Sequence, residues 1–132
     1  MTNKELILLT LEQKMGFSPE TDDEGDIFFP YQMKTIYVCP GEYEPCVSVM
    51  LFNFHEIQDG TEPKVLAVTN RMNRELRFAK VFVEKTFKHV SASCDFYYND
   101  EEALEQNLRH SLEVLGVIRS LFRMNMDELS ED

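Results

Sequence analysis

The sequence lacks the short motifs that mark most enzymes. It contains no glycine-rich phosphate loop, no GxSxG, no HExxH and no Cys–His pair at a recognisable spacing. Three cysteines and three histidines are present, but none of them form the closely spaced pairs that are typical of zinc ligands. We therefore expect a protein that is not an enzyme and that uses no metal or other cofactor.

Basic residues are scarce as well. The chain has 13 Lys and Arg against 24 Asp and Glu, which gives a net charge of −11. This balance argues against nucleic acid as a partner, because binding to nucleic acid depends on neutralising phosphates. It favours basic or amphipathic protein partners instead.

Long apolar runs are also missing. The apolar run within the N-terminal stretch "MTNKELILLTLEQKMGF" is far shorter than a signal peptide or a membrane span requires. The cysteines form no CxxC pair, and such an odd set of thiols is typical of a reduced compartment. We expect a cytoplasmic protein with no membrane partner.

What the sequence does contain is a regular series of helix and strand patterns within one domain, 1–132. Their order, α-β-β-β-α-β-β-α, is not the repeating βα order of a parallel sheet, so it predicts an α+β fold with about five antiparallel strands packed against helices. The predicted helices are 2–15, 62–76 and 100–124, and the predicted strands are 26–32, 34–40, 45–57, 77–86 and 89–98.

The strand at 45–57 is apolar on both faces, which predicts a central strand covered on both sides for part of its length. Strict alternation places five residues on one of these faces: Cys46, Ser48, Met50, Phe52 and Phe54.

The first and last helices carry more apolar residues than one buried face requires, which predicts a homodimer or a partner contact. The residues expected on this surplus apolar face are Leu8, Leu9, Val114, Val117, Leu121 and Met124.

One segment runs against the acidic character of the chain. Residues 64–88 hold seven basic and two acidic side chains, a charge of +5. Two interpretations stay open: a solvated helix end whose cations pair with acids elsewhere, or a positive surface for an anion or an acidic partner. The candidate residues for such a surface are Arg71, Arg74, Arg77, Lys80, Asn70 and Asn73. The two asparagines could equally pair with backbone groups near the end of their helix.

The stretch "LAVTNRMNRELRFAKVFVE" resembles the YbjN family of bacterial proteins, in which a helix with an Asn-x-x-Asn pair leads into a strand that begins with Phe, a small residue and a base. Here these residues are Asn70, Asn73, Phe78, Ala79 and Lys80. The order of elements also resembles the type III secretion chaperone-like fold over most of the chain. The resemblance implies an antiparallel α+β domain, often dimeric, and carries over no catalytic residues. The wider fold includes small acidic chaperones that hold an extended client segment, and YbjN proteins are described as candidate regulators of bacterial sensory transduction.

The sequence therefore predicts a non-enzymatic, cytoplasmic, homodimeric bacterial domain, chaperone-like or regulatory, that holds a segment of a partner protein. The alternative is a regulatory domain that senses a small ligand or an anion through the basic 64–88 stretch.

Overall fold

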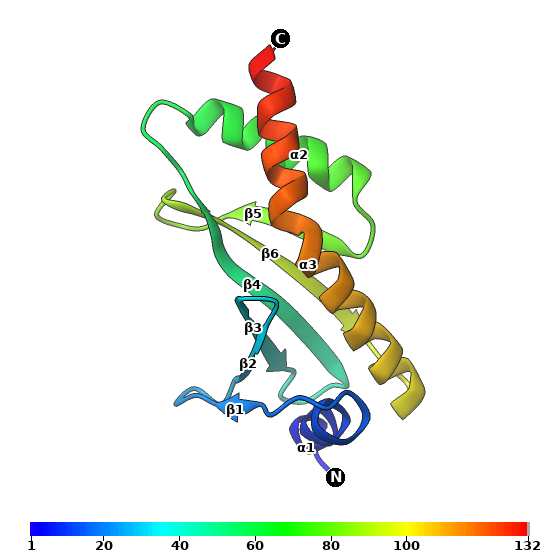
Figure 1. Cartoon of the computed structure of the whole chain (residues 1–132). Helices are drawn as coiled ribbons and strands as arrows, with labels where there is room; N and C mark the ends of the chain where they lie inside the picture. The colour runs from blue at the N-terminus through cyan, green and yellow to red at the C-terminus, as the bar shows by residue number, and fades with distance from the viewer. Residues whose placement is uncertain (132) are drawn as a thin grey trace.

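A computed structural model describes residues 1–131, in which six antiparallel strands form one sheet in the order β1-β2-β3-β4-β6-β5 (Figure 1). The elements are α1 (Asn3–Leu9), the π-helical turn η1 (Thr10–Lys14), β1 (Glu20–Thr21), β2 (Ile27–Tyr31), β3 (Lys34–Pro40), β4 (Cys46–Glu56), α2 (Glu62–Glu75), β5 (Ala79–Val83), β6 (His89–Tyr97) and α3 (Glu101–Glu131).

The predicted α+β class and the order of the elements are confirmed. The sequence missed β1, which is only two residues long and pairs with β2 across an acidic turn. In that turn the Asp22 carboxylate accepts hydrogen bonds from the backbone N–H groups of Glu24 and Asp26 at 3.0 and 2.9 Å. The last helix extends further than the predicted 100–124 and runs to Glu131.

The core lies between the sheet and the helices. Alternate residues of β2, β3 and β4 point to this inner face and are buried, as expected for a sheet that is covered on one side, whereas in β6 Ser91 and Ser93 of the other face are buried as well. The facing stripe of α3 repeats every three or four residues. Its fully buried members are Leu104, Leu108, Leu115, Ile118 and Phe122.

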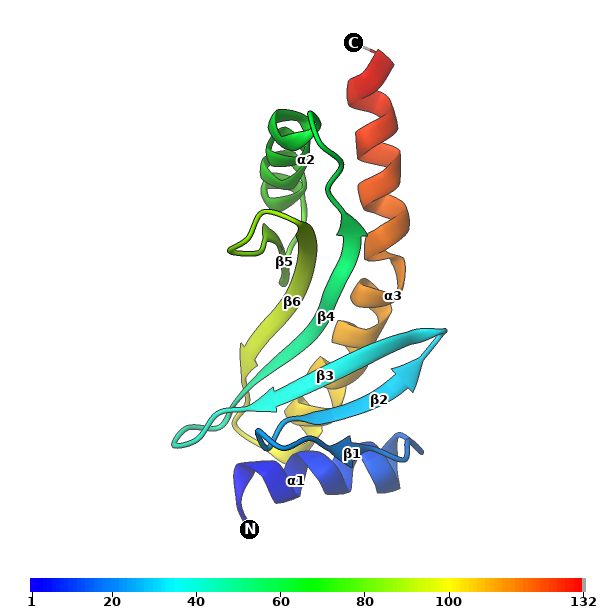
Figure 2. The ribbon, with the colours of Figure 1, turned by 90° about the vertical axis from the view of Figure 1, so that its left-hand side faces the viewer.

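The opposite face of the sheet carries no helix in the described residues (Figure 2). The prediction that β4 is covered on both sides is therefore wrong. Aromatic side chains from neighbouring strands partly shield this outer face instead: the ring centroids of Phe28 and Tyr37 lie 5.6 Å apart, and those of Tyr37 and Phe52 lie 5.3 Å apart.

A bulge interrupts the alternation of β4. Between the pairs Leu51↔Ala92 and His55↔Val90, β4 advances four residues while β6 advances two, and Asn53 takes a positive φ of 52°. The expectation that Phe54 shares a face with Phe52 is therefore wrong. Phe54 turns inward and is 8% exposed, whereas Phe52 stays on the outer face and is 44% exposed.

None of the helices in the described residues combines the length and the apolar composition needed to cross a membrane.

Candidate functional site

The ladder between β3 and β4 ends while both strands continue. Pairing runs from Pro40↔Val47 to Tyr37↔Met50 and stops there. Beyond that point residues 34–36 of β3 pair only with β2, and in β4 Leu51, His55 and Glu56 pair only with β6, while 52–54 form no ladder pair. The two strands therefore diverge inside the sheet, which leaves each with an edge that has no strand partner.

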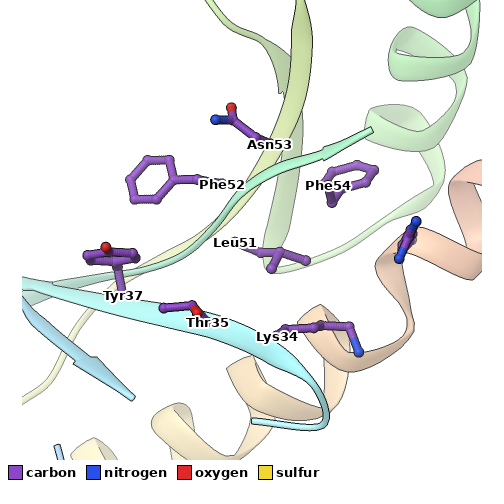
Figure 3. A pocket seen from close by; sticks show the side chains of 8 residues that line it. Lys34, Thr35, Tyr37, Leu51, Phe52, Asn53 and Phe54 are labelled. Carbon is purple, nitrogen blue, oxygen red and sulfur yellow. The ribbon is translucent and has the colours of Figure 1, made fainter. Parts of the chain in front are cut away.

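A cleft of about 330 Å³ opens where this ladder would have continued. In the existing register, Lys34, Thr35 and Ile36 would have faced Asn53, Phe52 and Leu51. Five of these six residues line the cleft, together with Tyr37, Phe54 and Arg119 (Figure 3). We call this space the β3–β4 cleft.

Two local features account for the divergence. The bulge at Asn53 bends β4 away from β3, and the Asn53 N–H donates to the Ser91 hydroxyl of β6 at 2.9 Å rather than to β3. The β2–β3 turn leans the other way, toward α3. The turn lies close to Gly116 of α3, where a Cβ atom would be 3.0 Å from Oε1 of Gln32.

A second hollow of about 490 Å³ continues from the β3–β4 cleft along the free edge of β4. The two share Phe54 and Arg119, and the second also includes His55, Glu56 and Arg123. We call the combined feature the β4-edge groove. It runs between residues 51–58 on one side and the second half of α3 on the other.

The cations of the β4-edge groove have no acidic partner in the described structure. Lys34, Arg119 and Arg123 take part in none of the ion pairs formed by residues 1–131. Lys34 only donates to the backbone carbonyl of Gln32, at 3.3 Å. Lys34 and Arg119 line the β3–β4 cleft without an acidic residue beside them, although the chain as a whole has a net charge of −11.

His55 sits beside these arginines. Its ring packs against Phe122, with the centroids 4.7 Å apart. Burial lowers the pKa of the His55 imidazole below its ordinary value, and the charges of Arg123 and Arg119 lower it further. The neutral imidazole is thus the form that this environment favours.

The outer edges of the sheet offer less free backbone. β1 is two residues long, and β5 is covered by α2, whose Asn73 side chain bonds to the backbone of Val81 (Figure 2). Free strand edges are templates for pairing with another chain. Residues 51–56 of β4 are a further edge at which a guest strand could pair, with the bulge at Asn53 in its middle.

The predicted basic surface is only partly free. Arg71 forms ion pairs with Glu75 at 3.6 Å and with Glu128 at 2.6 Å, and Lys80 pairs with Asp95 at 3.4 Å. The side chain of Asn73 forms hydrogen bonds with the backbone of β5. Asn70, Arg74 and Arg77 are exposed on α2 and just after it, and none of the six residues lines the β4-edge groove. That they form a partner surface stays a prediction.

The predicted apolar face is divided between two places. Val114, Val117, Leu121 and Met124 form one stripe on α3, in which Val117 is 51% and Met124 is 57% exposed. Leu8 and Leu9 are half-buried on α1, which lies at the opposite end of the molecule from the C-terminal end of α3 (Figure 1).

Sequence reasoning missed the groove residues Lys34, Arg119 and Arg123. Near the second half of a helix, arginines are expected for their favourable interaction with the helix dipole, so the two on α3 carried no special signal. Their spacing of four residues does place them on one side of α3. The sequence does not show that this side of α3 faces a cleft, because the cleft exists only where β3 and β4 diverge.

The fold around this groove matches a solved structure. The crystal structure of YbjN from E. coli, described as a candidate transcription regulator, aligns with a TM-score of 0.62 at 13% sequence identity. The alignment covers 87% of this chain and 85% of that one. At this identity the likeness establishes the fold. A comparison with curated protein sequences gives no match.

A family model then defines the class of protein as a peptide-binding chaperone. Residues 2–124 match the model described as "T3SS (YopN, CesT) and YbjN peptide-binding chaperone 1", and the chain belongs to this family. The predicted resemblance to the YbjN family and to the type III secretion chaperone-like fold is confirmed. Membership supports a role in binding proteins and favours such a role over catalysis.

Proposed function

We propose that this domain holds an extended segment of a partner protein against residues 51–56 of β4, as an added strand, and that it catalyses no reaction. The observation that carries the proposal is the end of the β3–β4 ladder at Tyr37↔Met50, with both strands continuing on either side of a cleft. Membership of a peptide-binding chaperone family supports the same role.

Strand addition suits the chemistry of this edge. In this mode of recognition the main chain of the guest supplies hydrogen bonds, and alternate side chains enter pockets that give specificity. Leu51 and Phe54 offer apolar contacts on the inner side of the β3–β4 cleft, while Tyr37 and Phe52 offer them on the outer side (Figure 3). A guest strand would therefore find apolar surface for side chains on both of its faces.

The alternative, a sensor of a small ligand or an anion that uses the 64–88 stretch, has less support. Two of its cations, Arg71 and Lys80, are engaged in ion pairs within the chain. The β4-edge groove contains no residue from that stretch.

An unbiased peptide experiment tests the proposal. A mixture of short random peptides, about eight residues long to span residues 51–56 in extended form, is added to isotope-labelled protein, and backbone amide shifts are recorded by NMR. We expect the largest changes at residues 34–36 and 51–56. Changes confined to the exposed stripe of α3 or to residues 70–80 would place binding elsewhere and contradict the proposal.

A closing variant supplies the control. Thr35 and Phe52 line the cleft from opposite strands, so Thr35→Cys with Phe52→Cys can be joined by a reducible bifunctional thiol reagent that spans the opening. The linked protein should lose the amide shifts, and reduction should restore them. Binding that persists in the linked form would contradict strand addition at this edge.

We further propose that the domain acts as a homodimer in a bacterial cytoplasm. The stripe of Val114, Val117, Leu121 and Met124 supports the dimer, because contiguous exposed apolar surface is unusual on monomers. Light scattering should give twice the 15.5 kDa mass of one chain. Val117→Glu with Met124→Glu should return it to the single-chain mass, and a parent mass that stays at 15.5 kDa as concentration rises would contradict the dimer.

A further inference from the structure

The charges in the β4-edge groove indicate which kind of segment it accepts. Lys34 and Arg119 line the β3–β4 cleft, and no Asp or Glu lines it with them. Arg123 follows one helical turn after Arg119 and lines the adjoining hollow. Glu56 and Asp127 line that hollow as well, but neither is within ion-pair distance of Arg119 or Arg123. The excess of positive charge is therefore greatest where β3 and β4 diverge.

We infer that the segment held at the β4-edge groove is acidic, with carboxylates that pair with Lys34, Arg119 and Arg123 while its main chain pairs with residues 51–56 of β4. This inference rests on the proposed function and adds the chemistry of the partner. Arginine suits the role because its planar guanidinium can bind a carboxylate with two parallel hydrogen bonds.

The preference for an acidic segment is the opposite of what the net charge of the whole chain would predict. A chain with a net charge of −11 repels acidic partners at long range, so an acidic segment must find local cations to bind. In the strand register of the proposal, alternate side chains of the guest point to the α3 side. Acidic residues at every second position would therefore face α3, and the intervening residues would face the outer side, where Tyr37 and Phe52 lie.

Three labelled peptides of about eight residues test the inference, each long enough for the free edge of β4. In the first, Glu alternates with Val and Phe, and in the second and third every Glu is replaced by Gln or by Lys. Binding is measured by fluorescence anisotropy at low and high salt, and the site is mapped by NMR amide shifts. We expect the Glu peptide to bind about tenfold more tightly than the Gln peptide, and the Lys peptide to bind more weakly still, with the preference reduced by salt.

Charge-reversal variants localise the effect. Arg119→Glu and Arg123→Glu should each weaken binding of the Glu peptide by about tenfold, and should improve binding of the Lys peptide. Lys85→Glu makes the same change in net charge at an exposed position in the β5–β6 turn and should leave the peptide affinities nearly unchanged. Arg74→Glu makes the same change on the rival basic surface of α2.

The outcomes separate the two proposals. If the Glu and Gln peptides bind equally well and both shift residues 51–56, the strand-addition function stands and the acidic preference is overturned. If none of the three peptides shifts residues 51–56, the proposed function itself fails. If Arg74→Glu weakens binding and Arg119→Glu does not, the acidic partner binds on α2. If free glutamate competes as well as the Glu peptide does, the groove is a small-anion site and the inference is overturned.

Discussion

The side chain of Asn73 pairs with both backbone groups of Val81. Its amide nitrogen donates to the Val81 carbonyl at 2.9 Å, and its oxygen accepts from the Val81 N–H at 2.8 Å. A side chain from α2 thus takes the place that a neighbouring strand would occupy beside β5. This contact satisfies the polar groups at the middle of an edge strand, which would otherwise pair with water or with another chain.

We expect Asn73→Ala to destabilise the protein by about 1–3 kcal/mol, because the contact is part-buried and the substitution leaves two backbone groups without a partner. Asn70→Ala is the matched control, since Asn70 is exposed on the same helix, and its effect should lie within about 0.5 kcal/mol. Chemical denaturation measures both values. Equal losses in the two variants would mean that the paired hydrogen bonds to Val81 contribute little.

The ion pair between Arg71 and Glu128 ties α2 to the last turns of α3. Both side chains are partly exposed, so we expect Arg71→Gln to lower the free energy of unfolding by only about 0.5–1 kcal/mol. The local effect should be larger. Amide hydrogen exchange in residues 125–131 should speed up in Arg71→Gln and stay unchanged in Arg74→Gln, whose arginine forms no ion pair among the described residues. Unchanged exchange in both variants would contradict a tethering role.

His55 should make stability depend on pH in a defined direction. The folded protein lowers the pKa of His55 below 6.5, so folding favours the neutral ring. The resulting stability is present above the pKa of the unfolded chain and is lost as the pH falls through the folded pKa. NMR titration of the imidazole should give a pKa below that of an unfolded peptide, and His55→Phe should remove this part of the pH dependence of unfolding. A pKa above the peptide value would contradict the expectation.

The same titration reports on the groove. The groups that line the hollow beside His55 are Arg119 and Arg123, with Glu56 and Asp127 alongside. A bound acidic peptide would offset the charges of the arginines and raise the pKa of His55. Binding should therefore strengthen as the pH falls through the range in which the His55 imidazole takes up its proton. The His55→Phe variant should lose this trend, and a decrease in affinity at low pH in the parent protein would contradict it.

Gly116 lies within α3, where glycine costs about 1 kcal/mol relative to alanine. A methyl group there would lie 3.0 Å from Oε1 of Gln32, an exposed side chain that can move, and at an ordinary contact distance of 3.8 Å from Cε1 of Tyr31. We therefore expect Gly116→Ala to raise the free energy of unfolding by about 0.5–1 kcal/mol. Gly116→Val should lose this gain, because its branched side chain is larger and disfavours helix. Destabilisation by the alanine variant would mean that the β2–β3 turn cannot shift.

Much of the fold could be predicted from the residues because its elements follow simple periods. The apolar residues Val90, Ala92, Cys94 and Phe96 of β6 and the apolar stripe of α3 each lie on the core side, although Ser91 and Ser93 on the other face of β6 are buried too. The strand at 45–57 could not be predicted in full. Its bulge lies at Asn53, without the glycine or proline that usually marks such a break, so strict alternation placed Phe54 on the wrong face.

The candidate site was beyond sequence reasoning for a related reason. Whether two strands of a hairpin stay paired along their whole length depends on contacts far along the chain, such as the Asn53 N–H with Ser91 and the β2–β3 turn with Gly116. The basic 64–88 stretch drew attention because its cations are close in sequence. Lys34 and Arg119 are 85 positions apart, and only the fold brings them to one cleft.

The free edge of β4 lies inside the sheet, and this position affects whether the sheet can grow from one molecule to the next. A strand added at the rim of an open sheet presents a new rim, to which the next molecule can attach, and fibres form in this way. A strand added beside residues 51–56 has α3 and the β2–β3 hairpin on its far side, so it presents no new rim. Under the proposed function, each copy would therefore take up one guest strand without offering an edge to the next molecule, so binding would not lead to polymerisation.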